Sequence, residues 1–109
     1  MRTHPAAGAN LLRVVPELVM VAEIVRSAHE RWDGCGYPDG LRGENIPLAS
    51  RIIFACDAYD AMVSDRPYRA ALGPDVAVAE LRVNAGSQFD PRVVRAVLVE
   101  LGEKPLLAA

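Results

Sequence analysis

The strongest constraint on the fold is a helical pattern that stops abruptly at a run rich in glycine and proline. Over residues 18–32, apolar or small residues recur every three or four positions, which is the spacing of an α-helix with one buried face. His29 falls on the same stripe, so we expect it to point inward beside Val25. Residues 34–38 then end the helix, because glycine reaches backbone angles closed to other residues and a residue that precedes proline avoids the helical region.

The rest of the chain is also helical in pattern, which predicts an all-α fold of about five helices. The expected helices cover residues 5–14, 16–32, 48–64, 74–84 and 91–101. Asp90 and Pro91 form a capping signal for the last of them. Residues 34–48 form a loop of roughly fifteen residues, a length that is usually functional or disordered. Its apolar residues favour an ordered loop pinned to the body of the domain.

Composition narrows the class of protein. The chain has 109 residues, of which 51% are hydrophobic, and this suits one compact domain. A net charge of -2 does not fit a nucleic acid polymer as partner, because such binders are normally basic. No apolar run reaches the length of a membrane span and no signal peptide pattern is present, so we expect a cytoplasmic protein without membrane contact. Cys35 and Cys56 are expected to be reduced thiols.

The third expected helix carries the acidic residues of a candidate site. Asp57, Asp60 and Ser64 share one face of it, and an adjoining face is largely apolar. That apolar face consists of Ile52, Cys56, Tyr59 and Val63. The arrangement places both carboxylates at the edge of the core. Carboxylates that converge with an inward histidine could bind a metal ion; the alternative is that both aspartates are simply solvated.

The sequence His-Glu-Arg-Trp-Asp-Gly-Cys-Gly-Tyr-Pro-Asp-Gly at residues 29–40 resembles the signature of the HD-GYP family. This family consists of metal-dependent phosphodiesterases that open cyclic di-GMP, within the HD phosphohydrolase superfamily. Three further elements match in the same order. They are a His-Pro-x-x-Gly element at residues 4–8, an Asp-bearing helix ending in Arg-Pro-Tyr at residues 46–69, and a turn at residues 86–91. The resemblance implies that residues 1–104 are the C-terminal half of a partial HD-superfamily helical domain, followed by a tail at residues 105–109.

The resemblance also implies roles for individual residues. The positions matching His4, His29 and Asp57 bind a divalent metal, iron or manganese, in that family. Arg66 and Arg69 would contact the phosphates of a cyclic dinucleotide, or else act only as cations at a helix C-terminus. Asp60 would support the metal ligands or lie on the substrate side. The loop residues Gly34, Gly36, Tyr37 and Pro38 would border the ligand or a partner, and Tyr37 could equally be a loop anchor.

The chain departs from the family pattern in its histidines. It contains only two of them and no His-Asp dipeptide. Ala28 stands where the family usually has the first of two adjacent histidines. A two-metal site needs roughly three protein ligands for each ion. We therefore expect His4, His29 and Asp57 to bind at most one ion weakly, and the chain alone to lack hydrolytic activity.

Three interpretations remain open at this point. The chain could be the C-terminal portion of a genuine phosphodiesterase domain. It could be a non-catalytic module that binds a nucleotide or a protein partner, such as a diguanylate cyclase domain. It could also be a structural helical fragment. Missing helices would leave apolar stripes exposed on the second and third helices, so we expect the chain either to form a homodimer or to be loosely packed.

Overall fold

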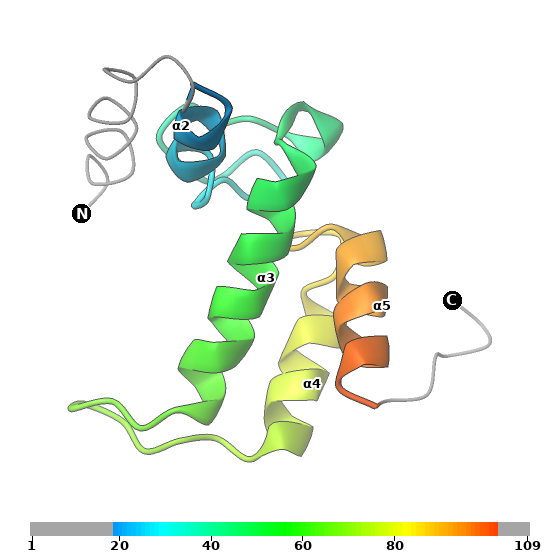
Figure 1. Ribbon diagram of the computed structural model, residues 1–109. Helices are drawn as coiled ribbons and strands as arrows, with labels where there is room; N and C mark the ends of the chain where they lie inside the picture. Colours follow the sequence, from blue (N-terminus) through cyan, green and yellow to red (C-terminus); the bar gives the residue numbers. More distant parts are fainter. Residues whose placement is uncertain (1–18, 103–109) are drawn as a thin grey trace.

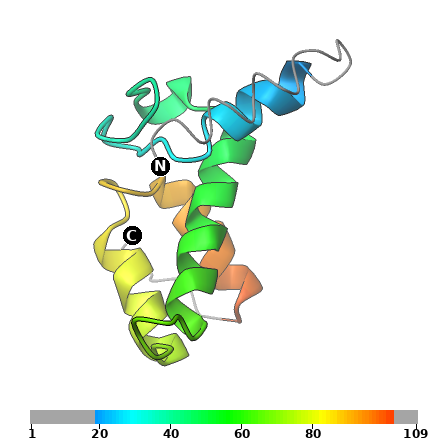
Figure 2. The same ribbon diagram turned by 90° about the vertical axis from the view of Figure 1, so that its left-hand side faces the viewer.

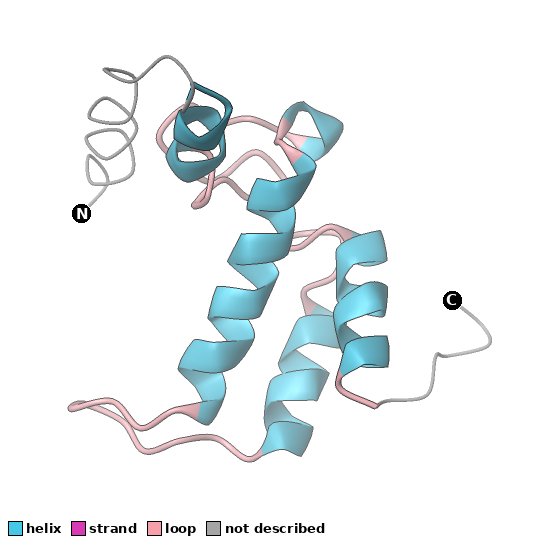
Figure 3. Cartoon of the chain, viewed as in Figure 1, coloured by secondary structure: helices cyan, strands magenta, loops and turns pink. Residues whose placement is uncertain are grey.

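The computed structural model of the chain describes residues 19–102. Within this range the chain is all-helical and contains no β-strand, so the expected fold class is confirmed (Figures 1 and 3). The described elements are α2 (Val19–Arg26), the 3₁₀ turn η2 (Gly43–Asn45), α3 (Leu48–Val63), α4 (Pro74–Val83) and α5 (Pro91–Glu100). The helix expected at residues 5–14 lies outside the described residues. None of the described helices is long and apolar enough to cross a membrane.

The core lies where α3, α4 and α5 pack together, and α2 lies at the N-terminal end of α3 (Figures 1 and 2). Its buried side chains are Ala55, Val78, Leu81, Phe89, Val93, Val94 and Leu98. The ring of Phe54 packs on Phe89 with 5.3 Å between centroids. Each of the three helices therefore contributes one apolar face, as helices in a small bundle must.

The starts of α4 and α5 agree with the sequence. Pro74 occupies the first turn of α4, where its missing N–H is not needed. Asp90 caps α5, since its Oδ1 accepts a hydrogen bond of 2.8 Å from the Arg92 N–H. Both boundaries were predicted from local signals, and both are confirmed.

The end of α2 differs from the expectation, and the expected inward position of His29 is wrong. The helix stops at Arg26 and a turn follows at residues 27–29. Within that turn the N–H of Ala28 bonds to the carbonyl of Val25, and the N–H of Glu30 to the carbonyl of Ser27. These tighter bonds replace the helical spacing. His29 is consequently exposed, whereas Glu30 is buried with only 1% of its surface accessible.

The orientation of α3 also differs from the expectation. Its side toward the core is formed by Ala55 with Phe54, Ala58, Tyr59 and Met62. Of the apolar face predicted for this helix, Tyr59 does pack on the core, whereas Ile52 is 43% exposed and Cys56 is exposed, so that face meets the core only in part. The reason is that α3 is apolar on more than one side, and periodicity alone does not choose between the sides. Asp57 and Asp60 are both exposed.

Candidate functional site

A buried carboxylate holds the loop of residues 34–48, called here the Gly-Tyr-Pro loop. Glu30 lies directly after the turn that ends α2. Its Oε2 accepts a hydrogen bond of 2.7 Å from the N–H of Asp39, and its Oε1 accepts one of 2.9 Å from the N–H of Leu41. Bonds to an ionised acceptor are stronger than neutral ones. Both carboxylate oxygens of Glu30 are thus used to fix the loop.

Gly36 brings the loop close to the turn at residues 27–29. A Cβ atom at this position would lie 2.5 Å from the backbone nitrogen of Arg31 and 2.6 Å from the carbonyl oxygen of His29. No side chain fits there, because both neighbours are backbone atoms. The next residue, Tyr37, donates its N–H to the same His29 carbonyl at 3.3 Å. The loop therefore requires glycine at position 36.

The rings of Tyr37 and His29 stack on each other. Their centroids are 5.3 Å apart and their planes differ by 7°. This contact brings together two residues that the sequence singled out for different roles. Tyr37 is half-buried, as a loop anchor would be, while His29 is exposed. The stacked pair forms an aromatic surface at the base of the Gly-Tyr-Pro loop.

Ion pairs fasten the loop at its margins. The guanidinium of Arg26 makes two hydrogen bonds of 2.8 Å to the carboxylate of Asp39. Arg31 pairs with Asp33 at 2.8 Å, and Asp33 Oδ1 also accepts the N–H of Cys35 at 3.0 Å. The hydrogen bonds from Arg31 and from the Cys35 N–H hold the pKa of Asp33 below its usual value. Such partly exposed pairs add little stability each, but they orient the loop.

A buried ion pair connects the loop region with α5. Arg51 Nη1 lies 2.6 Å from Asp90 Oδ2, and its Nε donates to the carbonyl of Ile46 at 2.9 Å. Its guanidinium also lies over the ring of Trp32, 5.9 Å from the centroid. Burial opposes the ionisation of Asp90, yet the hydrogen bonds from Arg51 and from the Arg92 N–H outweigh it, so the pKa of Asp90 is lowered. Sequence patterns did not identify this link.

The predicted metal ligands are not brought into one described cluster. His4 lies outside the described residues. His29 is exposed and stacked on Tyr37, and Asp57 is exposed on α3. Across residues 19–102 no three His, Cys, Asp or Glu side chains are placed so as to hold a metal ion. The described residues therefore do not fit a divalent-metal site on their own, and the site of His4, His29 and Asp57 stays a prediction.

The predicted phosphate-binding arginines follow α3, at the end of that helix away from the Gly-Tyr-Pro loop (Figure 1). Arg66 is exposed. Arg69 donates from Nη2 to the carbonyl of Ala61 at 2.9 Å and from Nη1 to the carbonyl of Ala70 at 3.0 Å. Arg69 thus neutralises the C-terminal end of α3, which agrees with the alternative role. The structure does not bring either arginine to Tyr37, and their phosphate contacts, like that of Asp60, remain predictions.

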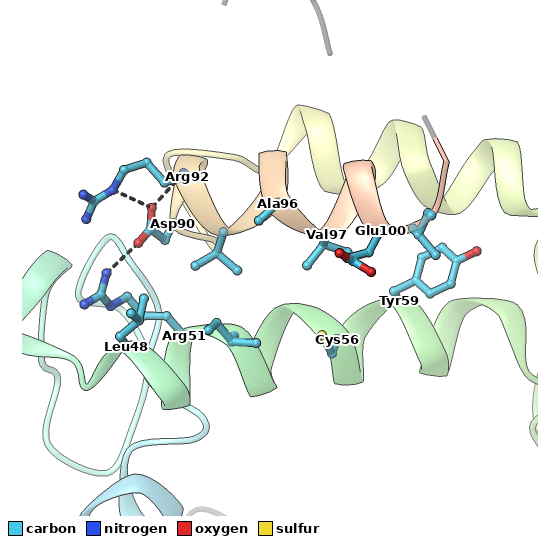
Figure 4. A pocket seen from close by; sticks show the side chains of 12 residues that line it. Leu48, Arg51, Cys56, Tyr59, Asp90, Arg92, Ala96, Val97 and Glu100 are labelled. Atoms are coloured by element: carbon cyan, nitrogen blue, oxygen red, sulfur yellow. Dashed lines mark hydrogen bonds and ion pairs between the residues drawn. The ribbon is translucent and has the colours of Figure 1, made fainter. Parts of the chain in front are cut away.

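A groove of about 630 Å³ runs between α3 and α5 (Figure 4). Its walls are mainly apolar and include Ile52, Tyr59, Val93 and Val97. Two of these residues belong to the α3 face that was expected to adjoin the core. The groove is therefore lined by part of the apolar face that was predicted for α3.

The amino-acid sequence matches a protein family model and several characterised proteins. Residues 1–93 match the family model described as "HD domain". The chain is 46% identical over 100 residues to the cyclic di-GMP phosphodiesterase response regulator RpfG of Xanthomonas campestris, covering 90% of this chain and 26% of that protein. It is 40% identical over 100 residues to a cyclic di-GMP phosphodiesterase of Thermotoga maritima, covering 90% of this chain and 27% of that protein.

The fold has a match among solved structures. A cyclic GMP-AMP specific phosphodiesterase of Vibrio cholerae superimposes with a TM-score of 0.76 at 31% identity, over 95% of this chain and 23% of that chain. The chain thus spans about a quarter of the length of the relatives it matches.

Proposed function

The chain belongs to the HD domain family, and we propose that it supplies the part of a cyclic dinucleotide phosphodiesterase that carries the Gly-Tyr-Pro loop, without hydrolytic activity of its own. Its relatives named above are cyclic di-GMP phosphodiesterases, in agreement with the resemblance to the HD-GYP signature at residues 29–40. The observation that carries the proposal is the fixed loop itself. Glu30 and Gly36 hold it against the turn that follows α2.

The donor set supports the second half of the proposal. The whole sequence contains two histidines, and residues 19–102 contain no group of three side chains arranged for a metal ion. Two-metal phosphodiester hydrolysis needs several ligands for each ion. His29 and Asp57 alone do not satisfy that requirement, and His4 adds only one more donor.

The experiment is a hydrolysis assay with the purified chain. Cyclic di-GMP and 3'3'-cyclic GMP-AMP are incubated separately with the chain and excess manganese or iron(II), and the products are separated by chromatography. We expect no linear dinucleotide above the protein-free control. Turnover that is lost in Asp57→Ala and retained in the matched exposed variant Asp75→Ala would contradict the proposal.

A second candidate function is binding without catalysis. The stacked rings of the exposed His29 and the half-buried Tyr37 favour it, because aromatic rings beside an ordered loop suit a nucleobase. The ligand would be a cyclic dinucleotide or a protein such as a diguanylate cyclase domain. In this case the loop serves recognition only.

Titration calorimetry distinguishes binding from a purely structural role. A binding module should give a saturable isotherm with cyclic di-GMP that weakens about tenfold or more in Tyr37→Ala, a loss of about 1.4 kcal/mol. Tyr68→Ala is the control, since Tyr68 is 82% exposed in the turn after α3. An absence of heat with the wild-type chain would favour the structural interpretation.

A further inference from the structure

The groove between α3 and α5 remains open in the described part of the chain, although its walls are apolar (Figure 4). Exposed apolar surface of this kind is usually covered by a partner. We propose that its occupant is a second copy of this chain, docked so that α5 runs antiparallel to α5 of the partner subunit. The two-fold axis passes beside Ala96.

The charge pattern of α5 points to a second copy. Arg92, Ala96 and Glu100 all line the groove and are spaced four residues apart, so they form one row along the helix (Figure 4). Ala96 is the midpoint of the row. In an antiparallel pair centred on Ala96, Arg92 lies opposite Glu100 of the partner subunit, and Glu100 lies opposite Arg92 of the partner subunit. The row is therefore complementary to itself.

The residue at the axis permits close contact. Ala96 is exposed and has the smallest side chain in the row. A small residue at the crossing point lets two helix backbones approach each other. Val93 and Val97 flank it on the same side of α5, and Ile52 and Tyr59 face them from α3. In each copy, α5 then packs into the groove of the partner subunit, so both copies use the same surface, as a closed two-fold dimer requires.

The two charged groups are available for such pairing. The Nε of Arg92 lies 3.9 Å from Oδ1 of the buried Asp90. Its Nη2 pairs with Glu44 at 2.9 Å, and the side chains of Arg92 and Glu44 are 64% and 73% exposed. A pair as exposed as this one is weak and can exchange partners. The side chain of Glu100 is exposed and makes no hydrogen bond or ion pair with another residue in the described range 19–102. Apolar burial would supply the affinity of the dimer, and the charges would fix its register.

Charge reversal tests the register. Arg92→Glu puts like charges opposite each other at both ends of the interface, and so does Glu100→Arg. Each single variant should raise the dimer dissociation constant about tenfold or more relative to the wild-type chain, by sedimentation equilibrium. An equimolar mixture of the two variants should restore association, because one copy then presents two acids and the other two bases. Circular dichroism melts check that both variants remain folded.

A cysteine at the axis tests the geometry independently. In a Cys35→Ser/Cys56→Ser background, Ala96→Cys should form a disulfide between copies under mild oxidation. A disulfide needs the two Cα atoms within about 4.4–6.8 Å of each other, and only a residue near the two-fold axis lies that close to its own counterpart. Val99→Cys, which is exposed on α5 but does not line the groove, should not form this disulfide. A monomeric wild-type chain overturns the proposal. A mixture of the two charge-reversal variants that fails to associate also overturns it. Protection of Ala96→Cys from alkylation in a monomer would overturn it too, because another segment of the chain would then occupy the groove.

Discussion

Glu30→Gln is the most informative change for the Gly-Tyr-Pro loop. The carboxylate is almost fully buried and each of its oxygens accepts a backbone N–H, from Asp39 and from Leu41. The amide of glutamine has the same shape but only one acceptor oxygen. Its NH₂ group would therefore face one of the two N–H donors, and a donor would lose its partner inside the structure.

The expected cost follows from the bond that is lost. A hydrogen bond to a charged group contributes about 1.5–3 kcal/mol, and an unsatisfied donor costs a similar amount. We expect Glu30→Gln to lower the free energy of unfolding by about 2 kcal/mol. If the loop opens without global unfolding, the free energy of that local opening should fall by the same amount. Glu44→Gln is the matched control in the same loop, because Glu44 is exposed. It should change stability by less than about 0.5 kcal/mol.

Two measurements check this expectation. Urea denaturation gives the free energy of unfolding, and amide hydrogen exchange gives the opening free energy at Asp39 and Leu41. A change of 2 kcal/mol corresponds to about thirtyfold faster exchange at these amides. Unfolding and exchange that match the wild-type chain in Glu30→Gln would refute the assignment of Glu30 as the group that holds the loop.

Three further outcomes are expected. Gly36→Ala should destabilise the chain by about 2 kcal/mol or more in urea denaturation, because its Cβ would meet backbone atoms. The control Gly73→Ala has open space around the new Cβ, so its free energy of unfolding should stay within about 1 kcal/mol of the wild type. Because the pKa of Asp90 is lowered in the folded state, its carboxylate stabilises the fold fully above the ordinary aspartate pKa, and this stabilisation is lost as the pH falls through the folded-state pKa. In Asp90→Asn, the free energy of unfolding should therefore fall less steeply with decreasing pH than in the wild type, as measured by urea denaturation at a series of acidic pH values. If His4, His29 and Asp57 bind manganese, excess metal should raise the melting temperature of the wild-type chain and not that of His29→Ala; equal melting temperatures with and without metal would remove that site.

Local signals in the sequence predicted the parts of the fold that depend on neighbouring residues. Pro74 and the Asp90 cap marked the starts of α4 and α5, because a capping group acts within one turn of the helix that it begins. The glycines and prolines of residues 34–48 marked the loop. The family signature lies in the same region, which is why the family was identifiable from the motif.

The sequence was less informative where tertiary contacts decide the outcome. His29 was misplaced because a short turn after Arg26 broke the helical period, and Glu30 became the buried residue instead. The apolar content of α3 did not reveal which side would meet the core. The pair of Arg51 and Asp90 joins residues 39 positions apart, and no local pattern identifies such a contact.

The central claim is that the chain keeps an ordered Gly-Tyr-Pro loop but does not hydrolyse cyclic dinucleotides by itself. The most direct measurement is a single-turnover experiment with the chain in excess over cyclic di-GMP and with added manganese, chelated before a ³¹P NMR spectrum is recorded. Hydrolysis converts one phosphodiester into a phosphomonoester, which has a separate signal. The account predicts a spectrum with phosphodiester signals only. A phosphomonoester signal that grows with time in the wild-type chain, and not in Asp57→Ala, would contradict it.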